Sequence, residues 1–290
     1  TQDSRGIIYV ANYDGILEYD GESWRLIPTP SSKYVRSLVT AHDGTIYAGT
    51  SGDVGMLQPD SVGVMRYVSL YDHIPEAHQG FKDVWSTLST PAGVYFQSNE
   101  RLFRWDGSSI TAWESEEGFH TAFEVRDELY VRDFRDGLLK MVGDSLQRVP
   151  GGARFADTPV LAMVPFPGGG TLIGTSRSGL YLFDGQSIRP FETDAQPFLD
   201  EYELYHGTTL SSGHAALATI GGGVLVVDPQ GRLVRVLGPA AELPDGVVHH
   251  VYEDRDGGLW TSFNSSGLAR AEVGSPLSKF DQTLGLEELV

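Results

Sequence analysis

The chain has 290 residues, no cysteine and a formal net charge of −18, which comes from 39 acidic and 21 basic residues. The lack of cysteine excludes disulfides, thiolate metal sites and cysteine nucleophiles, and the negative charge makes nucleic acid an unsuitable partner. The sequence shows no run of about 18 apolar residues that could span a bilayer and no signal peptide at Thr1. Only four residues are lysine. We therefore interpret the acidic surface as solvation, as in proteins of saline environments, with recognition as the alternative.

An internal repeat dominates the sequence. Each copy holds a polar turn, an apolar strand with an aromatic residue, a Gly step and a second apolar strand, which Asp-Gly often follows. The steps fall at Gly15, Gly55, Arg101 (in place of Gly), Gly137, Gly179, Gly223 and Gly267, an average of about 42 residues apart. With 35 Gly and 15 Pro, this period predicts an all-β fold, a seven-bladed β-propeller of four-stranded antiparallel blades, as one domain over residues 1–290.

In chain order, the first copy predicts strands at residues 7–11 and 16–19, and strands like the latter follow at 102–105 and 180–183, each ending in Asp-Gly. The seventh copy is the clearest, with an inner strand at 248–253, a turn at 254–257, strands at 259–263 and 267–272, and an outer strand at 276–280. One large apolar residue per copy should pack between neighbouring sheets. This column holds Tyr9, Tyr47, Tyr95, Tyr130, Leu172, Ala216 and Trp260.

Both ends of the chain fall inside the repeat, so the first copy lacks most of its inner strand. An open ring would leave two unpaired strand edges. We therefore expect residues 287–290 to pair beside residues 7–11 and close the ring.

The seventh copy, which reads Val-Tyr-Glu-Asp-Arg-Asp-Gly-Gly-Leu-Trp-Thr from Val251 and Ser-Gly-Leu-Ala-Arg from Ser266, resembles the two-component regulator propeller repeat. Shorter pieces at residues 46–50 and 172–180 are similar to the core of that repeat. Copies three, four and six depart from it and are assigned mainly by spacing. The resemblance implies a scaffold and carries no catalytic motif.

Members of that family are typically extracytoplasmic sensor regions of bacterial signalling proteins. The resemblance therefore implies a sensory, ligand-binding propeller on the periplasmic or extracellular side of a membrane-anchored protein, as a fragment of a longer multidomain regulator. Its expected partners are an oligosaccharide or another small ligand, the adjacent domains of the same protein, and a second copy in a homodimer. A polysaccharide-acting propeller enzyme and a protein-interaction scaffold are the alternatives.

Ligands of propellers usually bind where the inner strands enter the central channel. At that level the repeats place Arg36, Trp85, His120, His206, His249 and His250. This basic and aromatic set would suit a sugar or an acidic oligosaccharide. Alternatively, one or two of these residues hydrogen-bond to neighbouring blades and the others are solvated.

Other polar residues give weaker signals. His73 and His78 flank a proline, which argues for a loop and against a zinc-binding helix face. The segment from Asp254 to Gly257 lacks the later Glu of a calcium loop, and equivalent positions in other copies are turns. Asp83, Asp133 and Asp200 could serve a propeller enzyme, but the sequence does not place any two together. We expect no metal, no cofactor and no catalytic residue in this chain.

Overall fold

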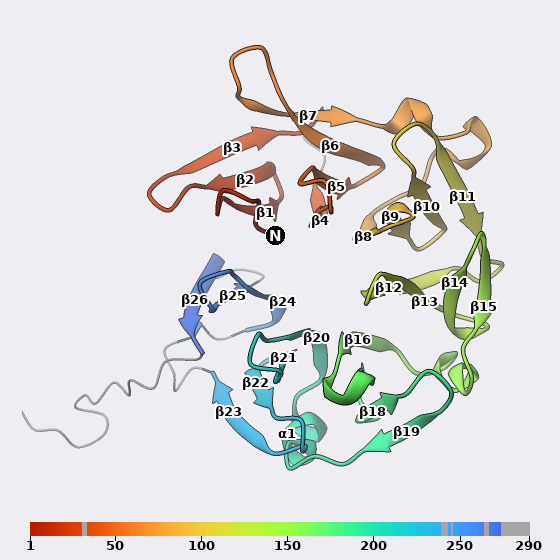
Figure 1. Cartoon of the computed structure of the whole chain (residues 1–290), viewed down its shortest axis with the longest axis vertical. Helices are drawn as coiled ribbons and strands as arrows, with labels where there is room; N and C mark the ends of the chain where they lie inside the picture. The colour runs from red at the N-terminus through yellow and green to blue at the C-terminus, as the bar shows by residue number, and fades with distance from the viewer. Residues whose placement is uncertain (31–33, 239–242, 245, 264–266, 274–290) are drawn as a thin grey trace, which may run out of the picture.

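The computed structural model of the chain describes residues 1–30, 34–238, 243–244, 246–263 and 267–273. Seven antiparallel sheets stand around a central axis, with one edge strand of each sheet next to the axis (Figure 1). The all-β, seven-bladed propeller predicted from the repeat is therefore confirmed.

Five blades have four strands and two have three in the described residues. Blade one contains β1 (Ile8–Asn12), β2 (Gly15–Tyr19) and β3 (Trp24–Pro28). Blades two to four contain β4 (Val35–Thr40), β5 (Ile46–Thr50), β6 (Asp53–Pro59), β7 (Met65–Ser69), β8 (Val84–Thr90), β9 (Gly93–Ser98), β10 (Arg101–Trp105), β11 (Ile110–Glu114), β12 (Phe119–Val125), β13 (Glu128–Asp133), β14 (Gly137–Val142) and β15 (Ser145–Arg148). Blades five to seven contain β16 (Val160–Pro165), β17 (Thr171–Thr175), β18 (Leu180–Phe183), β19 (Ile188–Phe191), β20 (Leu204–Thr209), β21 (Ala215–Thr219), β22 (Gly223–Val227), β23 (Leu233–Leu237), β24 (Val248–Glu253), β25 (Gly258–Phe263) and β26 (Gly267–Glu272).

Helical structure is confined to connections and turns. The only α-helix in the described part, α1 (Gln196–Glu201), joins blades five and six, and short 3-10 turns lie at η2 (Tyr71–His73), η3 (Glu76–His78), η4 (Gly152–Phe155) and η5 (Pro167–Gly169). None of the helices in these ranges has the length and apolar character needed to cross a bilayer.

The inner edge of blade one is occupied near its start by the first residues of the chain. The Tyr9 N–H donates to the Thr1 carbonyl at 2.9 Å, and Gln2 bridges to Ile8. The predicted outer strand at 276–280 and the predicted closing strand at 287–290 lie outside the described residues.

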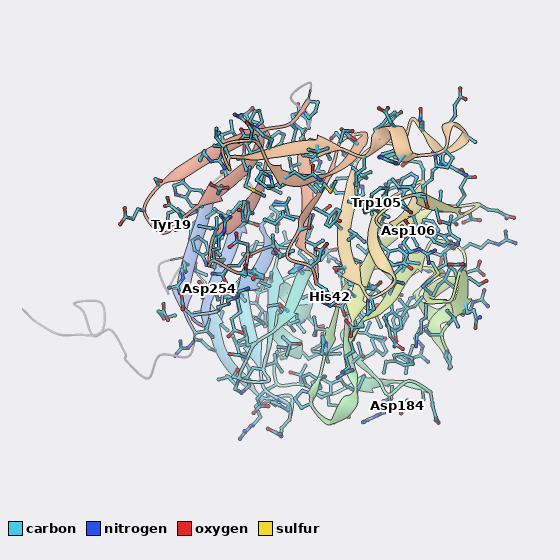
Figure 2. The ribbon with its side chains drawn as sticks, turned by 45° about the horizontal axis from the view of Figure 1, so that its top comes forward. Tyr19, His42, Trp105, Asp106, Asp184 and Asp254 are labelled. Carbon is cyan, nitrogen blue, oxygen red and sulfur yellow. The ribbon has the colours of Figure 1, made fainter. Side chains whose placement is uncertain are left out.

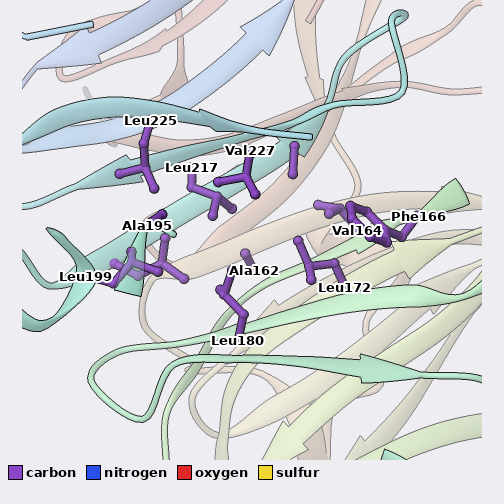
Figure 3. Packing of buried hydrophobic residues seen from close by; sticks show 12 residues of the cluster. Ala162, Val164, Phe166, Leu172, Leu180, Ala195, Leu199, Leu217, Leu225 and Val227 are labelled. Carbon is purple, nitrogen blue, oxygen red and sulfur yellow. The ribbon is translucent and has the colours of Figure 1, made fainter. Parts of the chain in front are cut away.

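Six apolar clusters fill the wedges between consecutive blades, from the first pair to the sixth. Each contains one residue of the predicted column, from Tyr9 between blades one and two to Ala216 between blades six and seven. Figure 3 shows the cluster between blades five and six, where Leu172 and Leu180 face Leu217 across the wedge. Because these side chains are almost completely buried, their removal from water holds neighbouring sheets together.

The Gly steps follow the prediction except in blade two. Gly223 has φ +82°, and a Cβ there would approach the Leu237 carbonyl oxygen to 2.1 Å. In blade two the positive φ belongs to Gly52, so the assignment of the step to Gly55 is wrong; Gly55 is small because the Tyr67 ring packs against it. In blade three no Gly is needed, because the Ser98 hydroxyl accepts the backbone N–H groups of Glu100 and Arg101.

The turn at Asp254 is organised by hydrogen bonds. The Asp254 carboxylate accepts the Gly258 backbone N–H at 2.8 Å, the Trp260 indole N–H at 2.8 Å and the Arg270 Nε at 2.7 Å. Trp260 also meets Tyr19 of blade one edge to face, with ring centroids 6.1 Å apart; Figure 2 labels Tyr19 and Asp254. Since protein donors occupy this carboxylate, the turn reading is supported, and no cluster of His, Asp or Glu able to hold a metal occurs in the described residues.

Replacement of Gly223 by alanine tests the tight step. We expect the left-handed backbone alone to cost about 1 kcal/mol, and the contact with the Leu237 carbonyl to add roughly 1–3 kcal/mol. Gly185 is the matched control, because it has φ +91° in an open hairpin with no atom near its Cβ direction. Denaturant unfolding should show a clearly larger loss for Gly223→Ala than for Gly185→Ala. Equal losses would refute the steric argument.

Asp254→Ala should lower the free energy of unfolding by about 3 kcal/mol, because it leaves the Arg270 guanidinium and the Trp260 N–H without their buried acceptor. Asp184 is the control: its carboxylate also accepts two backbone N–H groups and a serine hydroxyl, but in an exposed hairpin (Figure 2). Asp184→Ala should therefore have the smaller effect in the same denaturation assay. A reversed order would contradict the role of Asp254 as a buried acceptor.

Candidate functional site

The inner strands of blades two to seven share one irregularity. Each has a β-bulge near its start, where it enters the central channel. A bulge bends the strand and turns the extra side chain away from the ladder. The bulged residues are Arg36 in β4, Trp85 in β8, His120 and Thr121 in β12, Leu161 in β16, Tyr205 in β20 and His249 in β24.

This geometry gives the predicted site residues a common level. Arg36, Trp85, His120 and His249 are bulge residues, and His206 and His250 each follow a bulge residue directly. In Figure 1 their strands, β4, β8, β12, β20 and β24, surround the centre of the ring. We call the channel opening at this level the mouth, and its side chains fall into three groups.

The first group lies over blades one to three. The Arg36 guanidinium pairs with Asp83 at 3.2 Å, and its Cζ lies 5.0 Å from the Trp85 ring, 5.6 Å from Tyr34 and 5.9 Å from Tyr13. The Tyr13 and Tyr34 rings meet edge to face at 4.7 Å. Tyr13, Tyr34 and Trp85, which we call the aromatic cluster, are 58%, 45% and 45% exposed. Cation–π contacts thus hold rings that remain open to solvent.

The second group lies at blade four. The centroids of the His120 and Phe134 rings are 5.7 Å apart, and Arg132 Cζ lies 4.7 Å from the centroid of the Phe134 ring. Arg132 is only 3% exposed and donates to the backbone carbonyls of Phe155 and Ala156. Burial, and next the Arg132 charge, lower the pKa of His120 to about 4. His120 is therefore neutral at pH 7.

The third group joins blades six and seven. The rings of His206 and His250 lie 4.0 Å apart, and those of Tyr205 and His249 5.1 Å apart. His206 Nδ1 accepts the Val251 backbone N–H at 3.3 Å. Burial lowers the pKa of His206 to about 4 and also lowers that of His249. The side chain of His250 is exposed to solvent, but the protein around it and the adjacent His206 hold its pKa well below its usual value.

The predicted site residues are therefore not a basic set near pH 7, which corrects the sequence-based expectation. The four histidines are neutral near pH 7, and Asp83 compensates the charge of Arg36. The reason is desolvation, which a sequence does not display. Arg36 and His206 also bridge neighbouring blades, as the alternative predicted for one or two residues.

The other polar candidates are separate from one another. His73 contacts Trp105, whereas His78 bonds to Glu114, so the pair does not converge on a zinc site. Asp83 pairs with Arg36. Asp133 accepts backbone N–H groups of its own turn, and Asp200 accepts the Gln196 amide. Each of these three carboxylates is therefore already bonded within the protein.

Sequence reasoning missed several mouth residues. Tyr205 and Leu161 occupy the same bulge column as Trp85, and aligning the copies on the first apolar residue of each inner strand would have found them. Tyr13 and Tyr34 lie in a turn and a connection outside the inner strands, so the repeat gives no signal for them. Two surface depressions, of about 430 and 400 Å³, lie toward the rims of blades three to five, away from the aromatic cluster.

The chain is similar in structure to propellers of two kinds. It aligns with two extracellular domains assigned to hybrid two-component systems of B. thetaiotaomicron, with TM-scores of 0.71 and 0.67 and identities of 16% and 17%. These alignments cover 93% and 92% of this chain but only 37% and 38% of those chains. The chain thus spans little more than a third of the length of these relatives.

A propeller enzyme is also similar. A catalytically inactive histidine-to-alanine variant of virginiamycin B lyase from Staphylococcus aureus, solved with quinupristin, aligns with a TM-score of 0.64 and 10% identity, over 86% of this chain and 87% of that one. At these identities the similarity establishes the fold alone. No sequence among the curated proteins matches the chain.

The family comparison bears on blade seven. The model of the two component regulator propeller matches residues 242–264, which contain the inner strand, the Asp254 turn and all of β25. This is the copy in which the sequence resemblance was strongest. The match confirms the resemblance to the two-component regulator propeller repeat within residues 242–264.

Proposed function

We propose that the chain is a sensory propeller on the extracytoplasmic side of a bacterial two-component-type signalling protein, and that it binds a carbohydrate at the mouth. Residues 1–290 would form one domain of a longer protein, with its adjacent domains and a second copy as partners. The regulator propeller repeat and the similarity to extracellular domains of hybrid two-component systems support the sensory role.

One observation carries the ligand-binding part of this proposal. Six consecutive inner strands place their bulged side chains around one opening, and most of these side chains are aromatic or imidazole rings. A residue needed only for the sheet would remain in the ladder, and bulges are common next to functional sites. Rings supply the flat apolar contact, and imidazole nitrogens the hydrogen bonds, that a sugar requires.

A propeller lyase is the second candidate, and one observation favours it. His249 is neutral near pH 7, and its buried Nε2 has no hydrogen-bond partner in the described residues. Such an imidazole can act as a general base. We prefer the sensory role because Asp83, Asp133 and Asp200 are already bonded to other groups of the protein.

The proposed function predicts stabilisation by saccharides. In a thermal-shift screen of mono- and oligosaccharides, including uronic acids, a bound ligand should raise the unfolding midpoint. Trp85→Ala and His249→Ala should weaken that binding by about tenfold each and leave the unliganded midpoint nearly unchanged. Product formation from a stabilising ligand would favour the lyase, and an equal loss of unliganded stability in both variants would favour a structural role.

The neutral histidines predict a pH effect on stability. An unfolded histidine titrates near pH 6.5, whereas folding lowers the pKa of His206 to about 4 and that of His250 also. Below about pH 6.5 the unfolded state takes up protons that the folded state does not. The free energy of unfolding therefore decreases as the pH decreases. The midpoint of the His206→Gln/His250→Gln variant should therefore fall less between about pH 7 and pH 5 than that of the parent.

His214→Gln is the control for this experiment, because the His214 ring lies in a hairpin outside the inner strands and bonds to the Ser212 hydroxyl. It should keep the pH slope of the parent. Identical slopes for the parent and the double variant would show that the channel histidines are not held neutral.

A further inference from the structure

We propose that the aromatic cluster of Tyr13, Tyr34 and Trp85 is a stacking site for an uncharged saccharide. This inference rests on the proposed function and deepens it, since it assigns the ligand class and adds Tyr13 and Tyr34 to the binding residues. The cluster lies where blades one, two and three meet at the mouth.

The first argument is exposure. The aromatic side chains of the wedges between blades, such as Tyr95 and Phe103, are almost completely buried. In the cluster, three rings from three blades keep about half of their surface in solvent and lie around one cation. The exposed faces can receive the apolar C–H face of a sugar ring, and tyrosine hydroxyls and the indole N–H can bond to its hydroxyls.

The second argument is rigidity. Arg36 contacts all three rings, and its own position is fixed by Asp83, which also accepts the Ser51 hydroxyl. The Tyr34 carbonyl accepts the Ser51 backbone N–H at 2.9 Å, which ties the connection before β4 to the same network. Rings held in place before binding lose little conformational entropy when a ligand arrives.

The third argument is charge. Asp83 compensates Arg36, and the flanking charges of Asp14 and Lys82 are opposite in sign. Arg132 is a cation at the mouth, but it is buried and bonded to backbone carbonyls. The net charge of −18 also repels anions at a distance. An acidic saccharide would therefore find no free cation in the cluster, whereas an uncharged one needs none.

The test is a titration by calorimetry with short neutral gluco-, manno- and xylo-oligosaccharides and with oligogalacturonides of matched length. At least one neutral series should bind, with an affinity that changes less than about twofold between about 0.05 M and 0.5 M NaCl. Tyr13→Ala and Trp85→Ala should weaken this binding by about tenfold. Trp24→Ala, a change of a ring that is 46% exposed on the outer strand of blade one, should leave it unchanged.

A second variant tests the charge argument. Asp83→Asn keeps the shape of the side chain but leaves Arg36 without its counter-charge, so oligogalacturonides should gain affinity by several fold while neutral oligosaccharides do not. Preferential binding of oligogalacturonides to the parent chain would overturn the inference.

Failure of this inference can be distinguished from failure of the proposed function. Neutral binding that His249→Ala weakens and Tyr13→Ala does not would overturn only the stacking site, and binding of no saccharide would overturn both.

Discussion

The structure depends on the packing of neighbouring sheets across narrow wedges. Six wedges between consecutive blades contain apolar clusters, and each cluster includes one residue of the predicted column. Removing these side chains from water is favourable only if adjacent sheets stay at a fixed angle, because close packing leaves no room for relative movement. The ring is therefore a rigid frame, and its inner strands begin at defined positions around the axis.

That frame explains why the mouth can carry a site. The second strands pack into the wedges, whereas bulged residues near the start of the inner strands, such as Trp85 and Tyr205, are partly exposed. The bulges release one side chain per blade from the ladder at this level. Side chains that are far apart in the sequence, such as Tyr13 and Trp85, thereby come to lie around one guanidinium.

The fold was predictable from the sequence because its determinants are local and repeated. The limits of β24 and β26 agree with the predicted strands, and six of the column residues are buried. The site was only partly predictable. The spacing placed Trp85 and His249 at one level, but Tyr13 joins them through tertiary packing alone. The error in charge has the same origin, since the protonation of His120 depends on its burial beside Arg132.

The central claim, that a saccharide stacks on Trp85, can be tested directly by ¹⁹F NMR of protein labelled with 5-fluorotryptophan. The chain has five tryptophans, and each resonance can be assigned by replacing one tryptophan at a time. Addition of a neutral oligosaccharide should shift the Trp85 resonance and leave that of Trp24, which is equally exposed on blade one, in place. A bound saccharide that leaves the Trp85 resonance unmoved would contradict the account.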